Sequence, residues 1–169
     1  MTATVHLISG GTGAGKTTYA IALASDTAAV RFSIDEAMTT LFDADKPEDA
    51  SFDWYMDRIG RIEADIWRTA TRIAPHSINI VLDLGFSLRD HREAFRARAE
   101  AADLAVQLHY LDVETEERWR RVEARNREKG ETFRLEVTRT MFDFVDAMFE
   151  VPDSAEIARL NGVLVKNTP

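Results

Sequence analysis

The sequence contains no cysteine among its 169 residues. That absence excludes disulfide bonds, thiolate metal sites and cysteine nucleophiles together. Long apolar runs are also missing, since no stretch approaches the ~20 residues that a membrane-spanning helix requires. The first residues, MTATVHLISGG, lack a basic region and lead straight into a glycine run, which is not the pattern of a secretory signal. We therefore expect a cytoplasmic protein without a membrane segment.

Positive charge is scarce. The chain has 21 lysines and arginines against 29 aspartates and glutamates, which gives a formal net charge of −8. A protein that holds a long polyanion usually presents a basic stripe. The composition therefore disfavours extended nucleic-acid binding, although it leaves room for a local basic pocket around one phosphorylated ligand.

Short apolar runs alternate with longer amphipathic stretches along the chain. Strands are expected over residues 4–9, 30–34, 77–82, 106–111 and 162–165. Helices are expected over residues 16–25, 36–42, 54–73, 88–102 and 114–128, with a further helix ending before Pro152. Strands separated by helices of this length are typical of repeated βαβ units with a parallel sheet. The pattern predicts a single doubly wound α/β domain over residues 1–169.

The most specific motif is a glycine-rich segment between the first predicted strand and the first predicted helix. It fits the pattern G-x-x-x-x-G-K-[ST] and consists of Gly10, Gly11, Thr12, Gly13, Ala14, Gly15, Lys16 and Thr17, followed by Thr18. Glycines allow the positive φ angles that turn backbone N–H groups toward phosphate oxygens. The helix presents its N-terminal amides, the lysine reaches the β- and γ-phosphates, and Thr17 is placed to bind Mg²⁺. The segment predicts a nucleotide site.

Asp35 follows the second predicted strand, in the sequence RFSIDEA. Ligands of open α/β sheets bind outside the carboxyl ends of the strands. A carboxylate at this place can accept the proton of a hydroxyl group that attacks a γ-phosphate. Ser33 and Glu36 also fit a capping box, so the alternative is that Asp35 only starts a helix. We predict that Asp35 is the catalytic base.

Asp83 follows the third predicted strand, in the sequence IVLDLGF. Four apolar residues before an aspartate resemble a Walker B strand, whose carboxylate holds Mg²⁺ directly or through water. The alternative is a strand that ends in an Asx turn. With the phosphate loop already in place, the metal role is the better interpretation.

Five arginines fall in the helix predicted after the fourth strand. Glutamates stand four residues before Arg118, Arg120, Arg121 and Arg127, which predicts ion pairs along a solvated helix face. Arg125 instead has a like charge, Arg121, at that spacing. We predict that Arg125, and after it Arg121, neutralise the transferring phosphoryl group from a lid over residues 118–135.

Candidates for the acceptor pocket come from two segments that combine aromatic and basic residues. Trp54 and Arg58 belong to FDWYMDR, and Phe86 and Arg89 belong to GFSLRDHR after Asp83. Such groups can hold a sugar, a base or an anionic acceptor. Ordinary aromatic packing and solvated arginines are the equally weighted alternative.

The phosphate loop, FSIDE, VLDLGF, WRRVEARN and KGETF…EVTRTMFDF together resemble a family of small bacterial ATP-binding proteins. These proteins are often labelled as AAA-domain proteins but are more similar to P-loop kinases. The wider group includes polynucleotide 5′-kinases, gluconate-type kinases, zeta toxins and chloramphenicol phosphotransferases. The resemblance implies a three-layer P-loop fold, with a five-stranded parallel sheet in the order 2-3-1-4-5 and a helical lid. It also implies that Asp35 acts as base, that Asp83 lies near the metal, and that Arg121 or Arg125 contacts phosphate.

These observations predict a phosphotransferase that depends on ATP and Mg²⁺ and acts on a hydroxyl group of a small molecule, as a monomer or dimer. A kinase of nucleic-acid 5′-hydroxyl ends is one alternative, because the acidic balance argues against long polymers but not against short ends. A nucleotide-binding regulatory module with slow hydrolysis is the other. The chain is too short for the second helical domain of AAA+ ATPases.

Overall fold

The computed structural model of the protein describes residues 3–130 and 136–166. Its centre is a five-stranded sheet in the order β2-β3-β1-β4-β5, in which every pair of neighbours is parallel. The strands are β1 (Thr4–Gly10), β2 (Val30–Ser33), β3 (Ile80–Asp83), β4 (Ala105–Leu111) and β5 (Val163–Val165). The predicted strand order and the predicted parallel sheet are confirmed.

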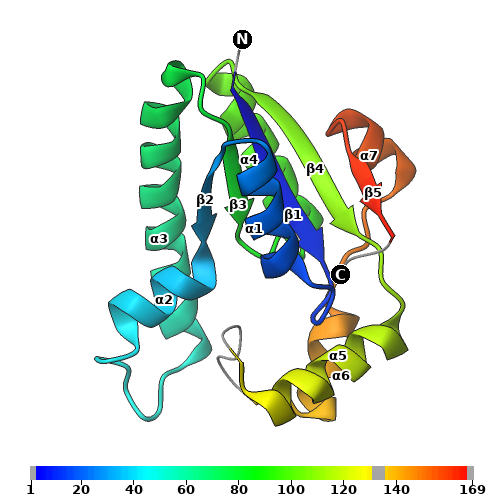
Figure 1. The fold of residues 1–169 in the computed structure, drawn as a ribbon. Helices are drawn as coiled ribbons and strands as arrows, with labels where there is room; N and C mark the ends of the chain where they lie inside the picture. The colour runs from blue at the N-terminus through cyan, green and yellow to red at the C-terminus, as the bar shows by residue number, and fades with distance from the viewer. Residues whose placement is uncertain (1–2, 131–135, 167–169) are drawn as a thin grey trace.

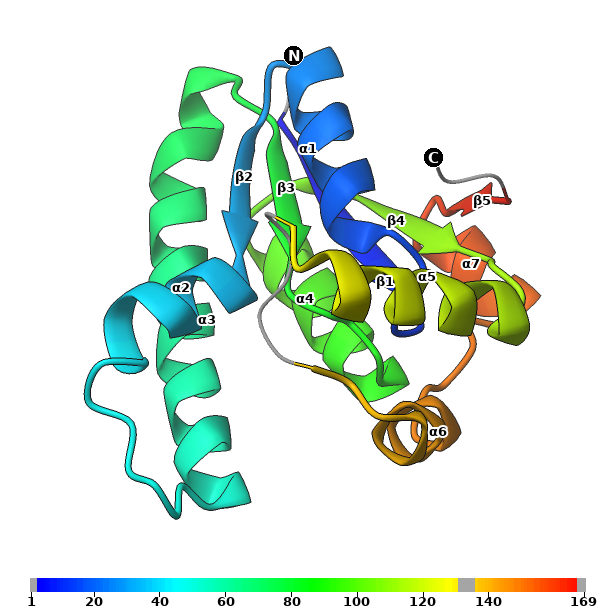
Figure 2. The ribbon, with the colours of Figure 1, turned by 60° about the horizontal axis from the view of Figure 1, so that its bottom comes forward.

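The helices cover both faces of this sheet and its carboxyl edge (Figure 1). They are α1 (Lys16–Asp26), α2 (Ile34–Phe42), α3 (Phe52–Ile73), α4 (Arg89–Ala101), α5 (Thr115–Glu128), α6 (Arg139–Ala147) and α7 (Ser154–Arg159), with a short 3-10 helix η1 (Ala74–His76). α1 packs on one face, whereas α3 and α4 pack on the other. Figure 2 shows α2 and α5 on opposite sides of the carboxyl ends of the central strands.

Alternate residues of the strands supply the two apolar layers, as expected for a sheet that is covered on both sides. Leu7 and Leu82, which are register partners, contact the α3–α4 layer. Ile8 and Val81 point the other way and pack with Ala20 of α1. Because all five strands are parallel, their carboxyl ends meet at one edge, and the groups that follow β1, β2 and β3 gather there.

Two elements differ from expectation. β3 begins at Ile80 instead of residue 77, because η1 and a left-handed Ser77 (φ 60°) occupy the preceding residues. α7 was not predicted, and its six residues are too short for a periodic apolar pattern. It is capped by Asp153 and held by the buried ion pair of Arg92 and Glu156 (Nε–Oε1 2.5 Å).

The predicted lid falls partly on α5, which covers residues 118–128 of it. Residues 131–135 of that segment lie outside the described residues. Within the ranges 3–130 and 136–166, no helix has the length and apolar character needed to cross a lipid bilayer.

Candidate functional site

The glycine-rich segment forms a tight loop between β1 and α1. Gly13 (φ 79°) and Gly15 (φ 87°) both take left-handed conformations, which cost a residue with a β-carbon free energy. The N–H group of Ala14 donates to the carbonyl oxygen of Gly11 (3.1 Å), which closes the loop on itself. Among the described residues, no side chain caps the first turn of α1, so its N-terminal amides are available to an anion.

Lys16 is held against this loop. Its ammonium group donates to the carbonyl oxygens of Gly10 (2.8 Å) and Gly11 (3.1 Å). Burial lowers the pKa of Lys16, whereas the nearby carboxylates of Asp83 and Asp35 act in the opposite direction. The lysine therefore lies in the electrostatic field of both aspartates that the sequence singled out.

Arg118 supports the loop from behind, a role that the sequence did not reveal. Its guanidinium donates to the carbonyl oxygens of Thr12 (3.3 Å) and Val113 (3.0 Å), and it forms an ion pair with Asp146 (2.7 Å). A β-carbon built on Gly11 would lie 2.4 Å from Nη1 of Arg118. That close approach explains why a glycine fits here, and it shows that α5 is packed directly on the loop.

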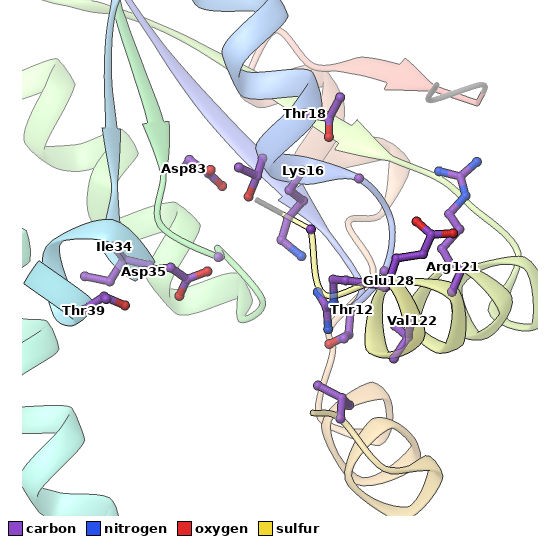
Figure 3. A pocket seen from close by; sticks show the side chains of 18 of the residues that line it. Thr12, Lys16, Thr18, Ile34, Asp35, Thr39, Asp83, Arg121, Val122 and Glu128 are labelled. Carbon is purple, nitrogen blue, oxygen red and sulfur yellow. The ribbon is translucent and has the colours of Figure 1, made fainter. Parts of the chain in front are cut away.

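A cavity of about 800 Å³ opens in front of the loop, between α2 and α5 (Figure 3). Six of the nine predicted nucleotide-binding residues line it, namely Thr12, Gly13, Gly15, Lys16, Thr17 and Thr18. The other three, Gly10, Gly11 and Ala14, are buried. The predicted catalytic and metal residues line the same cavity, namely Asp35, Asp83, Arg121 and Arg125. One cavity therefore brings together groups that the chain spreads over more than 100 residues.

Asp35 lies in the first turn of α2, on the wall opposite the phosphate loop (Figure 3). The helix is capped by Ser33, whose hydroxyl accepts a hydrogen bond from the N–H group of Glu36 (3.3 Å). Because Ser33 already fills the capping position, Asp35 is not needed for that role. Its exposed carboxylate is available to a ligand in the cavity.

Asp83 ends β3 and is buried, with 6% of its surface exposed. Arg31 of β2 donates to its Oδ2 atom (3.3 Å) and also to Glu36 (2.9 Å). Burial raises the pKa of Asp83, and the positive charges of Arg31 and Lys16 oppose that rise. Sequence reasoning missed Arg31, because its partner Asp83 is 52 residues away in the chain.

The arginines of α5 find ion-pair partners both within the helix and on α6. Arg121 pairs with Glu117 (3.1 Å) as predicted, but Arg120 also pairs with Glu117, and Arg118 pairs with Asp146 on α6. The expected partners of Arg118 and Arg120, Glu114 and Glu116, are thus not the ones that the structure shows. Asp146 on α6 replaces the local partner of Arg118, whereas Arg120 keeps a partner on α5 at a spacing of three residues.

Arg125 lines the cavity and lacks a glutamate partner at the favourable spacing. Its Nε atom is buried and has no hydrogen-bond partner among the described residues. Burial lowers the pKa of Arg125, and Asp35 across the cavity acts against this effect. A guanidinium still stays protonated at neutral pH. It is therefore a half-buried positive charge that a phosphate group can satisfy.

The four predicted acceptor residues do not line this cavity. Phe86 is fully buried and packs on Phe95 (ring centroids 5.1 Å apart). Arg89 forms an ion pair with Asp153 at the start of α7 (3.0 Å). Arg58 stacks over the ring of Trp54 (3.8 Å), and its Nη1 atom donates to the carbonyl oxygen of Trp54. These contacts are structural, so the acceptor contacts predicted for Trp54, Arg58, Phe86 and Arg89 receive no support from the geometry.

The oxygen donors in the cavity suit a Mg²⁺ ion that accompanies a nucleotide. Thr17 offers a hydroxyl and Asp83 a carboxylate, of which Arg31 occupies only one oxygen. Mg²⁺ usually keeps several waters and binds through one or two protein oxygens plus phosphates. In the part of the chain that the structure describes, no group of three or more histidine, aspartate or glutamate side chains forms a dedicated metal cage. The donor set thus fits Mg²⁺ held jointly with phosphate.

Comparison with solved structures identifies the fold. Kti12 from Chaetomium thermophilum, in complex with ADP-AlF3, is 17% identical with a TM-score of 0.69, and the match covers 96% of this chain and 88% of that one. The APS kinase CysC from Mycobacterium tuberculosis, in complex with AMPPNP and APS, is 16% identical with a TM-score of 0.64, covering 99% and 91%. A gluconokinase from Sinorhizobium meliloti is 15% identical with a TM-score of 0.56, covering 96% and 81%.

No curated protein matches the sequence. The family described as AAA domain matches residues 5–152, which include the phosphate loop, both aspartates and α5. The three solved structures confirm the P-loop kinase-like fold that the motifs predicted. The chain belongs to this AAA-domain family, with the fold of the P-loop kinases.

Proposed function

We propose that the protein is a phosphotransferase that depends on ATP and Mg²⁺ and moves the γ-phosphoryl group to a hydroxyl group of a small molecule. One arrangement carries the proposal: Asp35 lies across a single cavity from the phosphate loop, whose Lys16 shares that cavity with Arg125. A module that only binds nucleotide needs the loop and the cations. A carboxylate on the opposite wall can in addition take the proton of an attacking hydroxyl group. This carboxylate favours phosphoryl transfer over nucleotide binding alone.

In the proposed reaction the carboxylate of Asp35 accepts the hydroxyl proton of the acceptor. The acceptor oxygen forms a bond to the γ-phosphorus while the bond from that phosphorus to the β,γ-bridging oxygen breaks, and ADP departs with the electron pair. Lys16 and Arg125 neutralise negative charge on the transferring group and on the leaving group. The N-terminal amides of α1 hold the remaining phosphate oxygens in position.

Thr17 and Asp83 would hold Mg²⁺ together with phosphate oxygens of the nucleotide. When bound there, the ion neutralises charge on the phosphate oxygens and fixes their orientation. Arg31, which donates to Oδ2 of Asp83, would keep this carboxylate oriented and ionised.

The test is a screen for stimulated ADP release, followed by the Asp35→Asn variant. Hydroxyl-bearing metabolites, antibiotics and 5′-hydroxyl oligonucleotides are supplied with ATP and Mg²⁺. We expect a small molecule to stimulate ADP release by the unaltered protein, and we expect Asp35→Asn to abolish that stimulation. ATP affinity should stay within about three-fold, because an asparagine keeps the size of the side chain and contributes no phosphate contact.

The matched control is Asp26→Asn, the same chemical change at the far end of α1, and it should leave turnover unchanged. Turnover of the true acceptor by Asp35→Asn at the unaltered rate would refute the base assignment. Stimulation by oligonucleotides alone would favour the 5′-hydroxyl kinase. Slow hydrolysis that no hydroxyl compound stimulates would favour a regulatory module.

A further inference from the structure

The two walls of the cavity differ in charge. Every cation among its described lining residues belongs to the nucleotide side, with Lys16 on α1 and Arg121 and Arg125 on α5. The opposite wall is made by α2, and its described lining residues are Ile34, Asp35, Met38 and Thr39. An acceptor attacking the γ-phosphate from the side of Asp35 lies against this second wall.

The α2 wall is mainly apolar and carries two polar side chains, Asp35 and Thr39. Residues four apart share one side of a helix, so Ile34 lies beside Met38 and Asp35 beside Thr39. Ile34 and Met38 are half-buried and pack partly on the core, while Asp35 and Thr39 are exposed. The wall thus offers aliphatic and thioether surface, one hydroxyl and one carboxylate, and a methionine adapts to irregular apolar shapes.

The chain that continues from this wall is acidic. Residues 34–58 contain eight carboxylates and two basic side chains, Lys46 and Arg58. Arg58 is stacked on Trp54 and pairs with Asp57 (3.7 Å), and Arg31 pairs with Glu36 (2.9 Å). Asp57 also pairs with Arg61 (3.5 Å), so these charges compensate one another. Residues 43–49, which connect α2 to α3, are exposed. Apart from these pairs, residues 34–58 carry six carboxylates and Lys46, so the net charge of this segment is negative.

Arginine and lysine are the side chains that bind phosphate, sulfate and carboxylate groups most strongly. The α2 wall supplies neither cation, and the N–H group of Glu36 in its first turn already donates to Ser33. An anion there would stand beside Asp35 and the triphosphate. An uncharged group gains apolar contact instead, and a cation gains electrostatic attraction. We propose that the acceptor is an uncharged or cationic hydroxyl compound, with its apolar part on Ile34 and Met38 and its hydroxyl group at Asp35, which rests on the proposed phosphotransfer.

The first experiment compares acceptors that share a scaffold and differ in charge. Amino alcohols, the corresponding uncharged alcohols and the corresponding hydroxy acids are tested for stimulated ADP release, with a 5′-hydroxyl oligonucleotide as the polyanionic member. We expect stimulation by uncharged or cationic compounds. Best stimulation by hydroxy acids or by the oligonucleotide overturns this inference while phosphotransfer itself stands.

A charge-reversal variant tests the cause of the preference. Glu48→Lys/Asp49→Lys changes the acidic connection without touching the phosphate loop, Asp35 or Asp83. We expect KM for a cationic acceptor to rise and KM for its anionic counterpart to fall, with kcat little changed and the ratio shifted about ten-fold at low salt. The control Asp26→Lys/Glu100→Lys makes the same net change near the ends of α1 and α4, and it should leave the ratio unchanged. Equal shifts in both variants overturn the inference.

A second measurement needs no turnover. The protein is saturated with a non-hydrolysable ATP analogue, and amino- and carboxyl-substituted nitroxides are added to separate samples. Paramagnetic broadening of the NMR signals of the α2 backbone amides is then recorded. We expect the cationic nitroxide to broaden these signals several-fold more. Equal or stronger broadening by the anionic nitroxide overturns the charge preference. Failure of every compound to stimulate ADP release contradicts phosphotransfer, and the nitroxides then decide the charge preference separately.

Discussion

Arg118 on α5 donates a hydrogen bond to the carbonyl oxygen of Thr12, so the helix after β4 is fastened to the phosphate loop. The same guanidinium pairs with Asp146 on α6 and is almost fully buried. The phosphate loop, α5 and α6 therefore meet at one side chain. The position of α5, and with it that of Arg125, is coupled to the conformation of the loop.

Replacement of this side chain is expected to affect both stability and nucleotide binding. Arg118→Met leaves Asp146 partly buried without its cation, and removing one member of such a pair costs about 2 to 3 kcal/mol of unfolding free energy. We expect ATP affinity to fall at least ten-fold, because the phosphate loop loses the hydrogen bond from Arg118 to the carbonyl oxygen of Thr12. Urea unfolding and ATP titration measure the two effects. Arg120→Met, at an exposed position of the same helix, is the control, and an equal loss of affinity in both variants would contradict the coupling.

Arg125 is expected to act on the rate of transfer more than on binding. Arg125→Met removes the half-buried positive charge across the cavity from Asp35. Loss of a phosphate-stabilising arginine in phosphoryl-transfer enzymes lowers kcat by about 10³-fold or more. Arg127→Met, two residues along the exposed end of α5, should lower kcat less than two-fold. Steady-state kinetics with the acceptor from the screen distinguish kcat from KM. A large rise in KM for ATP at unchanged kcat would assign Arg125 to binding alone.

Arg31 is expected to set the pH range in which Asp83 supports Mg²⁺. Burial raises the pKa of Asp83 and Arg31 opposes it, so Arg31→Met raises that pKa further. The protonated form then persists to higher pH, and the gain in ATP affinity that Mg²⁺ provides should be lost at a higher pH than in the unaltered protein. ATP titrations with and without Mg²⁺ from pH 5 to 8 measure this midpoint. Arg31→Lys, which keeps the charge, should move it less, and identical midpoints for Arg31→Met and the unaltered protein would refute the role.

The buried His109 is expected to make the free energy of unfolding depend on pH. It is buried between His6 (3.0 Å) and the hydroxyl of Tyr19 (2.8 Å), and burial lowers its pKa to about 4. In the unfolded chain it takes up a proton near pH 6.5, whereas the folded protein resists protonation until about pH 4. The contribution is therefore present above pH 6.5 and is lost as the pH falls, by about 2 kcal/mol between pH 7 and pH 5.

Urea unfolding at several pH values measures that slope. His109→Gln should make it shallower, because the variant has no imidazole to protonate. The burial of His6 acts in the same direction, so some slope will remain. His76→Gln, at an exposed histidine, is the control and should keep the full slope. An unchanged slope in His109→Gln would contradict the assignment.

Local patterns in the sequence were enough to predict the parallel sheet and the polar groups that follow its strands. The phosphate loop, Asp35 and Asp83 each sit at a strand end, and parallel strands bring such ends together. Arg118 and Arg31 could not be found in this way, because their partners Thr12 and Asp83 are 106 and 52 residues away in the chain. A buried arginine in a charged helix has the same local sequence as a solvated one.

Phe86 shows that a residue close to the site in the sequence can still belong to the core. An aromatic residue just after a strand-end aspartate has the same local sequence whether it faces a ligand or the core. Only the packing of α4 shows that it fills the core, with its carbonyl oxygen accepting hydrogen bonds from Ser9 (2.9 Å) and Arg92 (3.0 Å). Tertiary contacts thus decided between the alternatives that the sequence left open.

The ammonium group of Lys16 donates to two carbonyl oxygens of its own loop. Phosphate oxygens that approach this ammonium group compete with those carbonyls, so nucleotide binding includes an exchange of hydrogen-bond acceptors. The affinity for a nucleotide would then reflect the preference of this ammonium group for phosphate over peptide oxygen, and not the full strength of the lysine–phosphate contact. A nucleotide whose phosphates reach the lysine poorly would leave it bonded to the loop, so we expect affinity to depend on the length of the phosphate chain.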